Sequence, residues 1–227
     1  MNNRPVFITG VPRSGTSMTA GLFSINGFYG GELIGATKDN KNGFFENRKI
    51  REGIVKRRLA AAGIDVLAQT IWKYPEEIMQ DKYVTLNSKS PLLLKKEVEE
   101  IMTSEGVWDN ADWFYKCAKL PLFGLIWSRA WPEATVVIVK RERETHINSL
   151  LRTGFMKCCS TPDSWNDWID VYDDYLNRLK DLFADVRVVY FEDITNGNFE
   201  GIEDILAERN MEFNEQLSNE FLYVPTN

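Results

Sequence analysis

The stretch VFITGVPRSGTSM, residues 6–18, joins a short run of β-branched and aromatic residues to a glycine-rich turn and then to helically spaced apolar residues. Gly10, Gly15 and Ser17 match the phosphate-loop pattern G-x-x-x-x-G-K-[ST], but Thr16 stands where that pattern has its lysine. A loop between a strand and a helix directs its backbone N–H groups and the positive end of the helix dipole at one point. The stretch therefore predicts a site for phosphate or sulfate.

The missing lysine bears on which anion this loop binds. In nucleotide triphosphatases that lysine reaches the outer phosphates, and the hydroxyl after it holds magnesium. Here the long cation of the loop is Arg13, with Ser14, Thr16 and Ser17 as hydroxyl donors. A ligand-free tight turn is one alternative. A magnesium-dependent nucleotide kinase or triphosphatase is another, and it would draw its acidic ligand from the end of the strand VRVVYFED, residues 186–193.

The composition suits a globular protein. The 227 residues are 44% hydrophobic and 12% aromatic, which is enough for a full core, and we expect one domain over residues 1–227. A net charge of -6 does not favour nucleic acid or an anionic membrane as partner. No stretch approaches the ~18 apolar residues of a membrane span, and the N-terminus lacks a leader pattern. We therefore expect a cytoplasmic protein.

Cysteine and histidine usage argues against a zinc site. Cys117, Cys158 and Cys159 are odd in number and lack C-x-x-C spacing, so we expect reduced thiols. His146 is the one histidine of the chain. Carboxylates alone are still able to hold magnesium. We expect no metal.

Apolar strands and helices alternate along the chain. Strands are expected at 6–9, 112–118, 135–140 and 186–192, and helices after Gly15, after Asn47, from Ser90, and at 121–131, 144–154, 164–183 and 199–210. Residues 64–88 give no clear pattern. Nearly continuous apolar strands joined by helices predict a mostly parallel sheet covered on both faces. The fold class is α/β, a three-layer α/β/α arrangement like that of the phosphate-loop nucleotide kinases.

The loop GVPRSGTS, residues 10–17, resembles the 5′-phosphosulfate loop of the PAPS-dependent sulfotransferases, where PAPS is 3′-phosphoadenosine-5′-phosphosulfate. That family has arginine or lysine where Arg13 stands, and Thr-Ser or Thr-Thr where Thr16 and Ser17 stand. The resemblance implies PAPS as donor, PAP (adenosine-3′,5′-bisphosphate) as product, and metal-free in-line transfer to a hydroxyl of a small molecule or carbohydrate. The residues it implies for the 5′-phosphosulfate are Pro12, Arg13, Ser14, Gly15, Thr16 and Ser17.

A second segment of the family, which binds the 3′-phosphate, resembles VVIVKRERETHINSLL, residues 136–151. In the family a strand ends in an arginine, and a serine eight residues later joins it; Arg141 and Ser149 have this separation. An arginine binds phosphate bidentately, and the serine lies about 12 Å along a helix. Arg143 is a further cation nearby. Taken alone, KRERE is typical of a solvated charge run.

The likeness is thin over the rest of the chain. It extends to residues 114–139, which resemble the family's lysine-bearing strand, helix and Trp-Pro turn, and to VVYFEDI, residues 188–194, which resembles its Tyr-Glu-Asp-Leu strand. The Arg-Lys-Gly segment of the cytosolic small-molecule branch is not found in the terminal FLYVPTN. The acceptors of that branch therefore do not carry over, and the adenine contacts stay unassigned.

The resemblance also implies a general base, which in the family is a histidine or glutamate beyond the phosphosulfate loop. His146 falls in the 3′-phosphate segment and reads as a helix residue near the cofactor. Glu46 is the candidate base, with Glu32 as its substitute, although a carboxylate just before a helix also serves as a dipole partner. Lys116, at the end of a strand, either polarises the leaving sulfate or extends to the sheet edge.

Aromatic residues offer candidates for an acceptor pocket, although most of them suit a core equally well. They are Phe44, Phe45, Trp72, Tyr74, Phe155, Trp165 and Trp168. They do not distinguish sugars from flat apolar alcohols. A non-catalytic nucleotide-binding protein is a further alternative to the transferase, and the sequence does not decide the oligomeric state.

Overall fold

A computed structural model describes residues 1–37 and 40–222 of the chain; residues 223–227 of the C-terminal stretch discussed above lie outside the described residues. Within these residues, four strands form a parallel sheet in the order β2-β1-β3-β4. The strands are β1 (Val6–Thr9), β2 (Phe114–Lys116), β3 (Thr135–Lys140) and β4 (Asp185–Tyr190). Because all four are parallel, their carboxyl ends lie on the same edge of the sheet.

Successive residues of β1 supply the two halves of the core because side chains alternate across a strand. Phe7 faces a large aromatic cluster and packs edge-on against Trp127, with ring centroids 5.1 Å apart. Val6 and Ile8 face the smaller apolar cluster on the other side of the sheet. Both faces of the sheet are therefore buried, as the nearly continuous apolar strands predicted.

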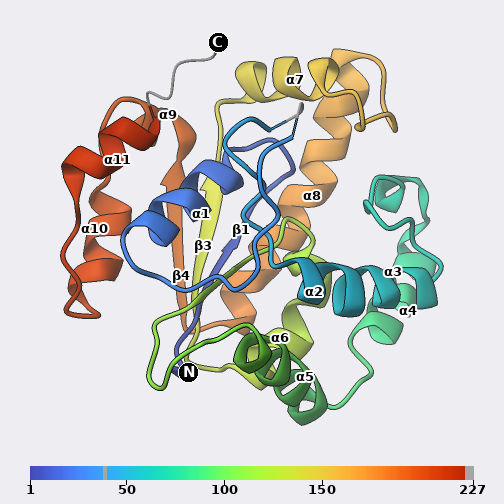
Figure 1. The fold of residues 1–227 in the computed structure, drawn as a ribbon. Coiled ribbons are helices and arrows are strands. Elements are labelled where there is room, and N and C mark those ends of the chain that lie inside the picture. Colours follow the sequence, from blue (N-terminus) through green and yellow to red (C-terminus); the bar gives the residue numbers. More distant parts are fainter. Residues whose placement is uncertain (38–39, 223–227) are drawn as a thin grey trace.

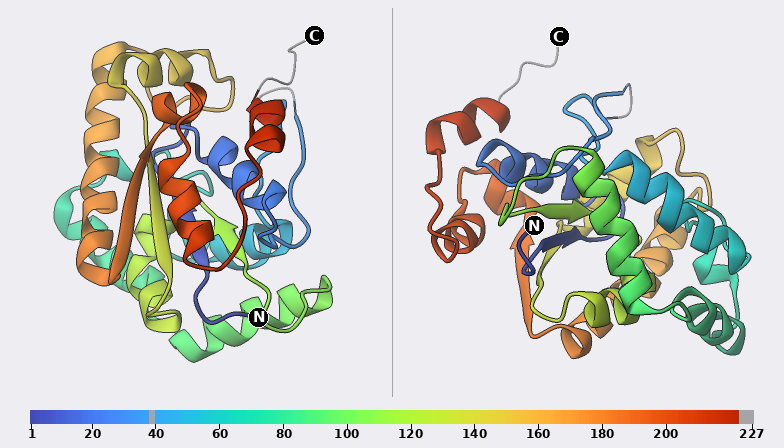
Figure 2. Two further views of the ribbon diagram at one scale, coloured as in Figure 1. Left: turned by 90° about the vertical axis from the view of Figure 1, so that its left-hand side faces the viewer. Right: turned by 60° about the horizontal axis from the view of Figure 1, so that its bottom comes forward.

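Helices cover both faces (Figure 1). On the smaller cluster lie α1 (Thr16–Ile25), α9 (Phe191–Thr195), α10 (Glu200–Ala207) and α11 (Glu215–Leu222). The larger cluster is covered by α2 (Arg48–Ile50), η1 (Arg51–Val55), α3 (Lys56–Ala61), η2 (Ile71–Lys73), α4 (Glu76–Leu86), α5 (Pro91–Ser104), η3 (Leu120–Phe123), α6 (Gly124–Ala130), α7 (Arg143–Arg152) and α8 (Pro162–Leu182). The left view of Figure 2 shows α10 and α11 in front of the sheet. The predicted three-layer α/β/α class is confirmed.

Element boundaries differ from the sequence expectation in several places. The strand expected over 112–118 is confined to Phe114–Lys116, and the helix α11 was not expected. The last strand ends at Tyr190, and Phe191 already begins the short helix α9, so the expected strand over 186–192 is too long. Residues 64–88, which gave no clear pattern, contain η2 and α4. The helix after Asn47 is capped as expected by that side chain, which accepts from the Ile50 N–H, but its middle is a π-helical turn. Apolar spacing alone does not reveal such a turn.

The described helices show no candidate membrane span, since none combines the length and the apolar content that crossing a bilayer needs.

Candidate functional site

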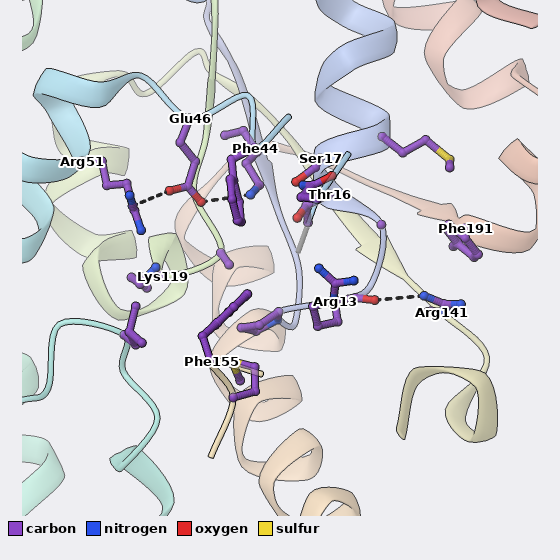
Figure 3. A pocket seen from close by; sticks show the side chains of 18 residues that line it. Arg13, Thr16, Ser17, Phe44, Glu46, Arg51, Lys119, Arg141, Phe155 and Phe191 are labelled. Atoms are coloured by element: carbon purple, nitrogen blue, oxygen red, sulfur yellow. Dashed lines mark hydrogen bonds and ion pairs between the residues drawn. The ribbon is translucent and has the colours of Figure 1, made fainter. Parts of the chain in front are cut away.

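The chain segments that follow three of the strands lie at the same edge of the sheet. β1 leads into the loop before α1, β2 ends at Lys116, and β3 leads to Arg141. Together with the loop before α2 they enclose a cavity of about 270 Å³ (Figure 3). Its lining residues are Pro12, Arg13, Gly15, Thr16, Ser17, Met18, Asn40, Phe44, Glu46, Arg51, Leu67, Lys116, Ala118, Lys119, Arg141, Phe155, Met156 and Phe191. The cavity thus lies at the carboxyl edge, where open α/β sheets bind ligands.

The loop after β1 has an unusual backbone. Gly15 has φ 106°, and Arg13, which is not a glycine, has φ 74°. A side chain at Gly10 would place its Cβ 2.4 Å from the Val139 carbonyl oxygen, and one at Gly15 would meet the Phe191 ring at 2.5 Å. Both glycines are therefore required by close packing. A non-glycine residue in the left-handed region costs of order 1–3 kcal/mol and is found preferentially at functional sites.

Arg13, Arg141 and Ser149, predicted from two separate motifs, lie side by side. Arg13 Nε donates to Ser149 Oγ over 3.4 Å, and Arg141 Nη1 donates to the carbonyl oxygen of Arg13 over 3.3 Å. The Arg141 guanidinium also stacks 4.1 Å from the centroid of the Phe191 ring. The loop and the start of α7 thereby form one cationic surface.

The charge state of Arg141 fits a site that receives an anion. Burial lowers the pKa of Arg141, the nearby charge of Glu192 raises it, and that of Arg13 lowers it again. Arginine nevertheless keeps its proton in proteins. Arg13 and Arg141 therefore stay charged at close range, and an anion between them would relieve their repulsion.

His146 contacts the backbone of the loop after β1. Its side chain is buried on α7, and Nε2 lies 2.8 Å from the carbonyl oxygen of Pro12. Burial lowers the pKa of His146 to about 4, with the charges of Arg141, Arg143 and Arg13 acting in the same direction against the bond to Pro12. The ring is therefore neutral near pH 7, and its bond to a carbonyl requires the proton on Nε2.

Glu46 lies at the other side of the cavity in a buried ionic network. Its Oε1 accepts from Lys116 Nζ over 2.9 Å, and its Oε2 lies 2.8 Å from Arg51 Nε. Burial alone would raise the pKa of Glu46, but the charges of Lys116, Lys119 and Arg51 outweigh it and bring the pKa to about 2. Glu46 is thus an ionised carboxylate held by two cations at contact distance.

Other candidates from the sequence lie away from the cavity. Glu32 is exposed and pairs with Lys49 at 3.7 Å, so the substitute base is not at this site. Glu192 accepts from the Glu142 N–H over 3.2 Å at the start of α7 rather than facing the cavity. Arg143 pairs with Asp170 of α8 at 2.7 Å.

Ser14 differs from its neighbours in the loop. Its hydroxyl is buried without a hydrogen-bond partner among the described residues, and the residue does not line the cavity. A role for Ser14 in holding a ligand therefore falls to its backbone rather than to its hydroxyl.

Two of the candidate aromatic residues line the cavity. Phe44 and Phe155 face each other with ring centroids 6.4 Å apart. Trp165 and Trp168 are fully buried in the core, and Phe45 packs against Phe221 in the other cluster. The lining residues that the sequence reasoning missed include Arg51, Leu67, Lys119, Met156 and Phe191. Of these, Lys119 could have been predicted from the sequence, since it follows Lys116, the end of a strand, by three residues.

In residues 1–37 and 40–222, no group of three or more His, Cys, Asp or Glu side chains is arranged to hold a metal ion.

The sequence over residues 5–215 matches the model of the sulfotransferase family. The chain belongs to this family. No curated protein sequence matches it significantly.

Solved sulfotransferase structures share the fold at low sequence identity. The sulfotransferase domain of the Synechococcus PCC 7002 olefin synthase has a TM-score of 0.60 and 14% identity, covering 100% of this chain and 78% of its own. Sulfotransferase STF1 from Mycobacterium tuberculosis H37Rv has a TM-score of 0.52 and 12% identity, covering 99% and 72%. The sulfotransferase from Alicyclobacillus acidocaldarius has a TM-score of 0.54 and 14% identity, covering 93% and 83%. The resemblance stated from the motifs is thereby confirmed at the level of family and fold.

The lowered pKa of His146 predicts a loss of stability in acid. Since the ordinary histidine pKa is near 6.5 and folding lowers it to about 4, the unfolded chain takes up a proton at higher pH than the folded protein. The contribution of the neutral His146 ring to the free energy of unfolding is complete above pH 6.5 and is lost as the pH falls to 4. Urea unfolding should show the wild type losing roughly 3 kcal/mol over this range relative to His146→Gln, at 1.36 kcal/mol per pKa unit. Parallel pH curves for the two proteins would contradict the neutral buried ring.

Proposed function

We propose that this sulfotransferase moves a sulfuryl group from PAPS to a hydroxyl of a small-molecule or carbohydrate acceptor. The observation that carries the proposal is the contact of Arg13 with both Arg141 and Ser149. It makes two anion-binding segments adjacent, as a donor with a 5′-phosphosulfate and a 3′-phosphate requires. The ionic pair of Lys116 and Glu46 lies in the same cavity, where an acceptor would meet the donor.

The residues present fit this donor. The loop after β1 leaves no room for side chains at positions 10 and 15, where the sequence has glycine. Thr16 begins a ten-residue helix whose first N–H groups lack helical partners. Pro12 to Ser17 would hold the 5′-phosphosulfate, and Arg141 with Ser149 the 3′-phosphate. When bound, PAPS supplies a sulfuryl group on a phosphate that leaves as PAP when the acceptor hydroxyl attacks.

Catalysis by the loop would be mainly electrostatic. Negative charge grows on the leaving oxygen during such transfers, and preorganised donors aimed at that oxygen stabilise it. Arg13 and Thr16 line the cavity, and together with the loop N–H groups they would take this role. Lys116 is 4% exposed and already bonded to Glu46, so its ammonium is fixed in position before any ligand arrives.

Glu46 would accept the proton of the acceptor hydroxyl. A carboxylate with a pKa of about 2 is a weak base. It would therefore take the proton late in the transfer, when bonding to sulfur has made the hydroxyl strongly acidic. Each oxygen of Glu46 contacts one cation, and each carboxylate oxygen has two lone pairs, so an accepting position is left on either.

Replacing Glu46 by glutamine should separate chemistry from donor binding. We expect kcat to fall by about 10²–10⁴-fold because the proton acceptor is lost. PAP affinity should stay close to that of the wild type, since Glu46 lies away from the Arg13–Arg141 surface. Rates measured with ³⁵S-labelled PAPS and the best acceptor of a hydroxyl panel test this.

The low pKa of Glu46 adds a second readout. The wild-type rate should show no inflection from Glu46 between pH 4.5 and 7, because the group is already ionised there. Full activity of Glu46→Gln would remove Glu46 from the catalytic role.

Donor identity is tested by calorimetric titration with PAP and with ATP, each with and without magnesium. PAP should bind without magnesium and more tightly than ATP. Arg141→Ala should weaken PAP binding by about 10- to 100-fold, because charge-assisted hydrogen bonds to phosphate are lost. Arg143→Ala is the matched control, since this arginine lies two residues further on and pairs with Asp170 instead.

Magnesium-dependent ATP binding that is indifferent to Arg141 would overturn the proposal in favour of a nucleotide kinase. PAP binding with no labelled product from any acceptor would favour a non-catalytic nucleotide-binding protein.

A further inference from the structure

Lys119 is a buried lysine whose charge is not used by the donor site described above. It follows β2 by three residues, directly before η3, and it lines the cavity while only 7% exposed. Among the described residues its ammonium has no hydrogen bond and no ion pair at contact distance, and Nζ is not one of the fully buried atoms that lack a partner. An ammonium in the cavity wall without such a partner is available to an anion that binds there.

The acids nearby are already engaged by other cations. Glu46 contacts Lys116 at 2.9 Å and Arg51 at 2.8 Å. Arg51 also pairs with Glu52 at 3.1 Å. Lys119 acts on Glu46 only at longer range, as one of the charges that lower its pKa. Glu52 in turn pairs with Lys56 at 2.7 Å. This end of the cavity therefore has more positive than negative charges, and Lys119 is the cation among them that has no contact partner among the described residues.

The position of Lys119 separates it from the donor surface. Figure 3 shows Lys119 beside Arg51 and Glu46, on the opposite side of the cavity from Arg13 and Arg141. The cavity wall also includes apolar side chains that would contact the body of a bound molecule. They are Phe44, Leu67, Ala118, Phe155 and Met156.

We propose that the acceptor is a hydroxy acid, with an apolar body and a carboxylate that Lys119 binds. This inference rests on the proposed transferase function and narrows its acceptor class. A carboxylate would give the Lys119 ammonium a contact partner, and the paired rings of Phe44 and Phe155 suit a flat or extended apolar body. The acceptor hydroxyl would then lie at Glu46 Oε1, the oxygen that Lys116 also contacts.

The test compares matched acids and amides on protein saturated with PAP and on free protein. The probes are 4-hydroxyphenylacetate, 3-(4-hydroxyphenyl)propanoate and 3-hydroxydecanoate, each against its neutral primary amide, by calorimetry. At least one acid should bind about tenfold or more tightly than its amide, as expected for a charge-assisted hydrogen bond.

Lys119→Met should reduce this preference to less than about twofold while leaving PAP binding and the melting temperature intact, since it removes a buried charge at similar volume. Lys96→Met is the control, because Lys96 is exposed on α5 and pairs with Glu100 at 3.7 Å. It should keep the full acid preference.

Three results would overturn the inference. No acid binds more tightly than its amide; the preference survives in Lys119→Met; or Lys119→Met loses PAP as Arg141→Ala does, which would assign Lys119 to the donor. Failure of the proposed function looks different, since the wild type would then either bind no PAP or bind PAP and form no labelled product with any acceptor. In that case the titrations on free protein still decide whether Lys119 binds a carboxylate.

Discussion

The backbone of the loop after β1 is the constraint on which the rest of the site depends. With Arg13 and Gly15 both at positive φ, the loop turns so that the Arg13 carbonyl oxygen meets Arg141 and the Arg13 side chain reaches Ser149. His146 fixes the preceding Pro12 carbonyl from the same helix. β3 and α7 therefore hold the loop at two successive residues. The backbone strain at Arg13 is stabilised by these contacts.

Charge compensation divides the cavity into two regions. At the loop, Arg13 and Arg141 lie close together, and a neutral His146 supports them without adding a third charge. At the opposite side, Glu46 is ionised because cations outweigh its burial. The donor region thus has two arginines close together, and the acceptor region has a fixed carboxylate beside Lys119. We infer that each region is completed by a different ligand.

The sequence predicted the features that depend on local patterns. Buried strands, the Asn47 cap and the loop before α1 are encoded by neighbouring residues, and the parallel order then brings Lys116 and Arg141 to the same edge. Local patterns did not show that Phe191 begins a helix or that a π turn follows Ile50. They also did not show that Arg51, the first residue of that turn, pairs with Glu46. The ionic network of Glu46 includes Lys116, which is far away in the chain, and a local pattern does not reveal such a contact.

The most direct test of whether one loop joins the two phosphate sites is a double-mutant cycle on Arg13→Ala and Ser149→Ala. The quantity measured is the dissociation constant for PAP. The side chains of Arg13 and Ser149 are in contact at 3.4 Å. We predict that the losses of PAP binding free energy in the two single variants are not additive, with an interaction energy of about 0.5–3 kcal/mol. Losses that add to within about 0.5 kcal/mol would mean that the two residues act independently, and would contradict the account.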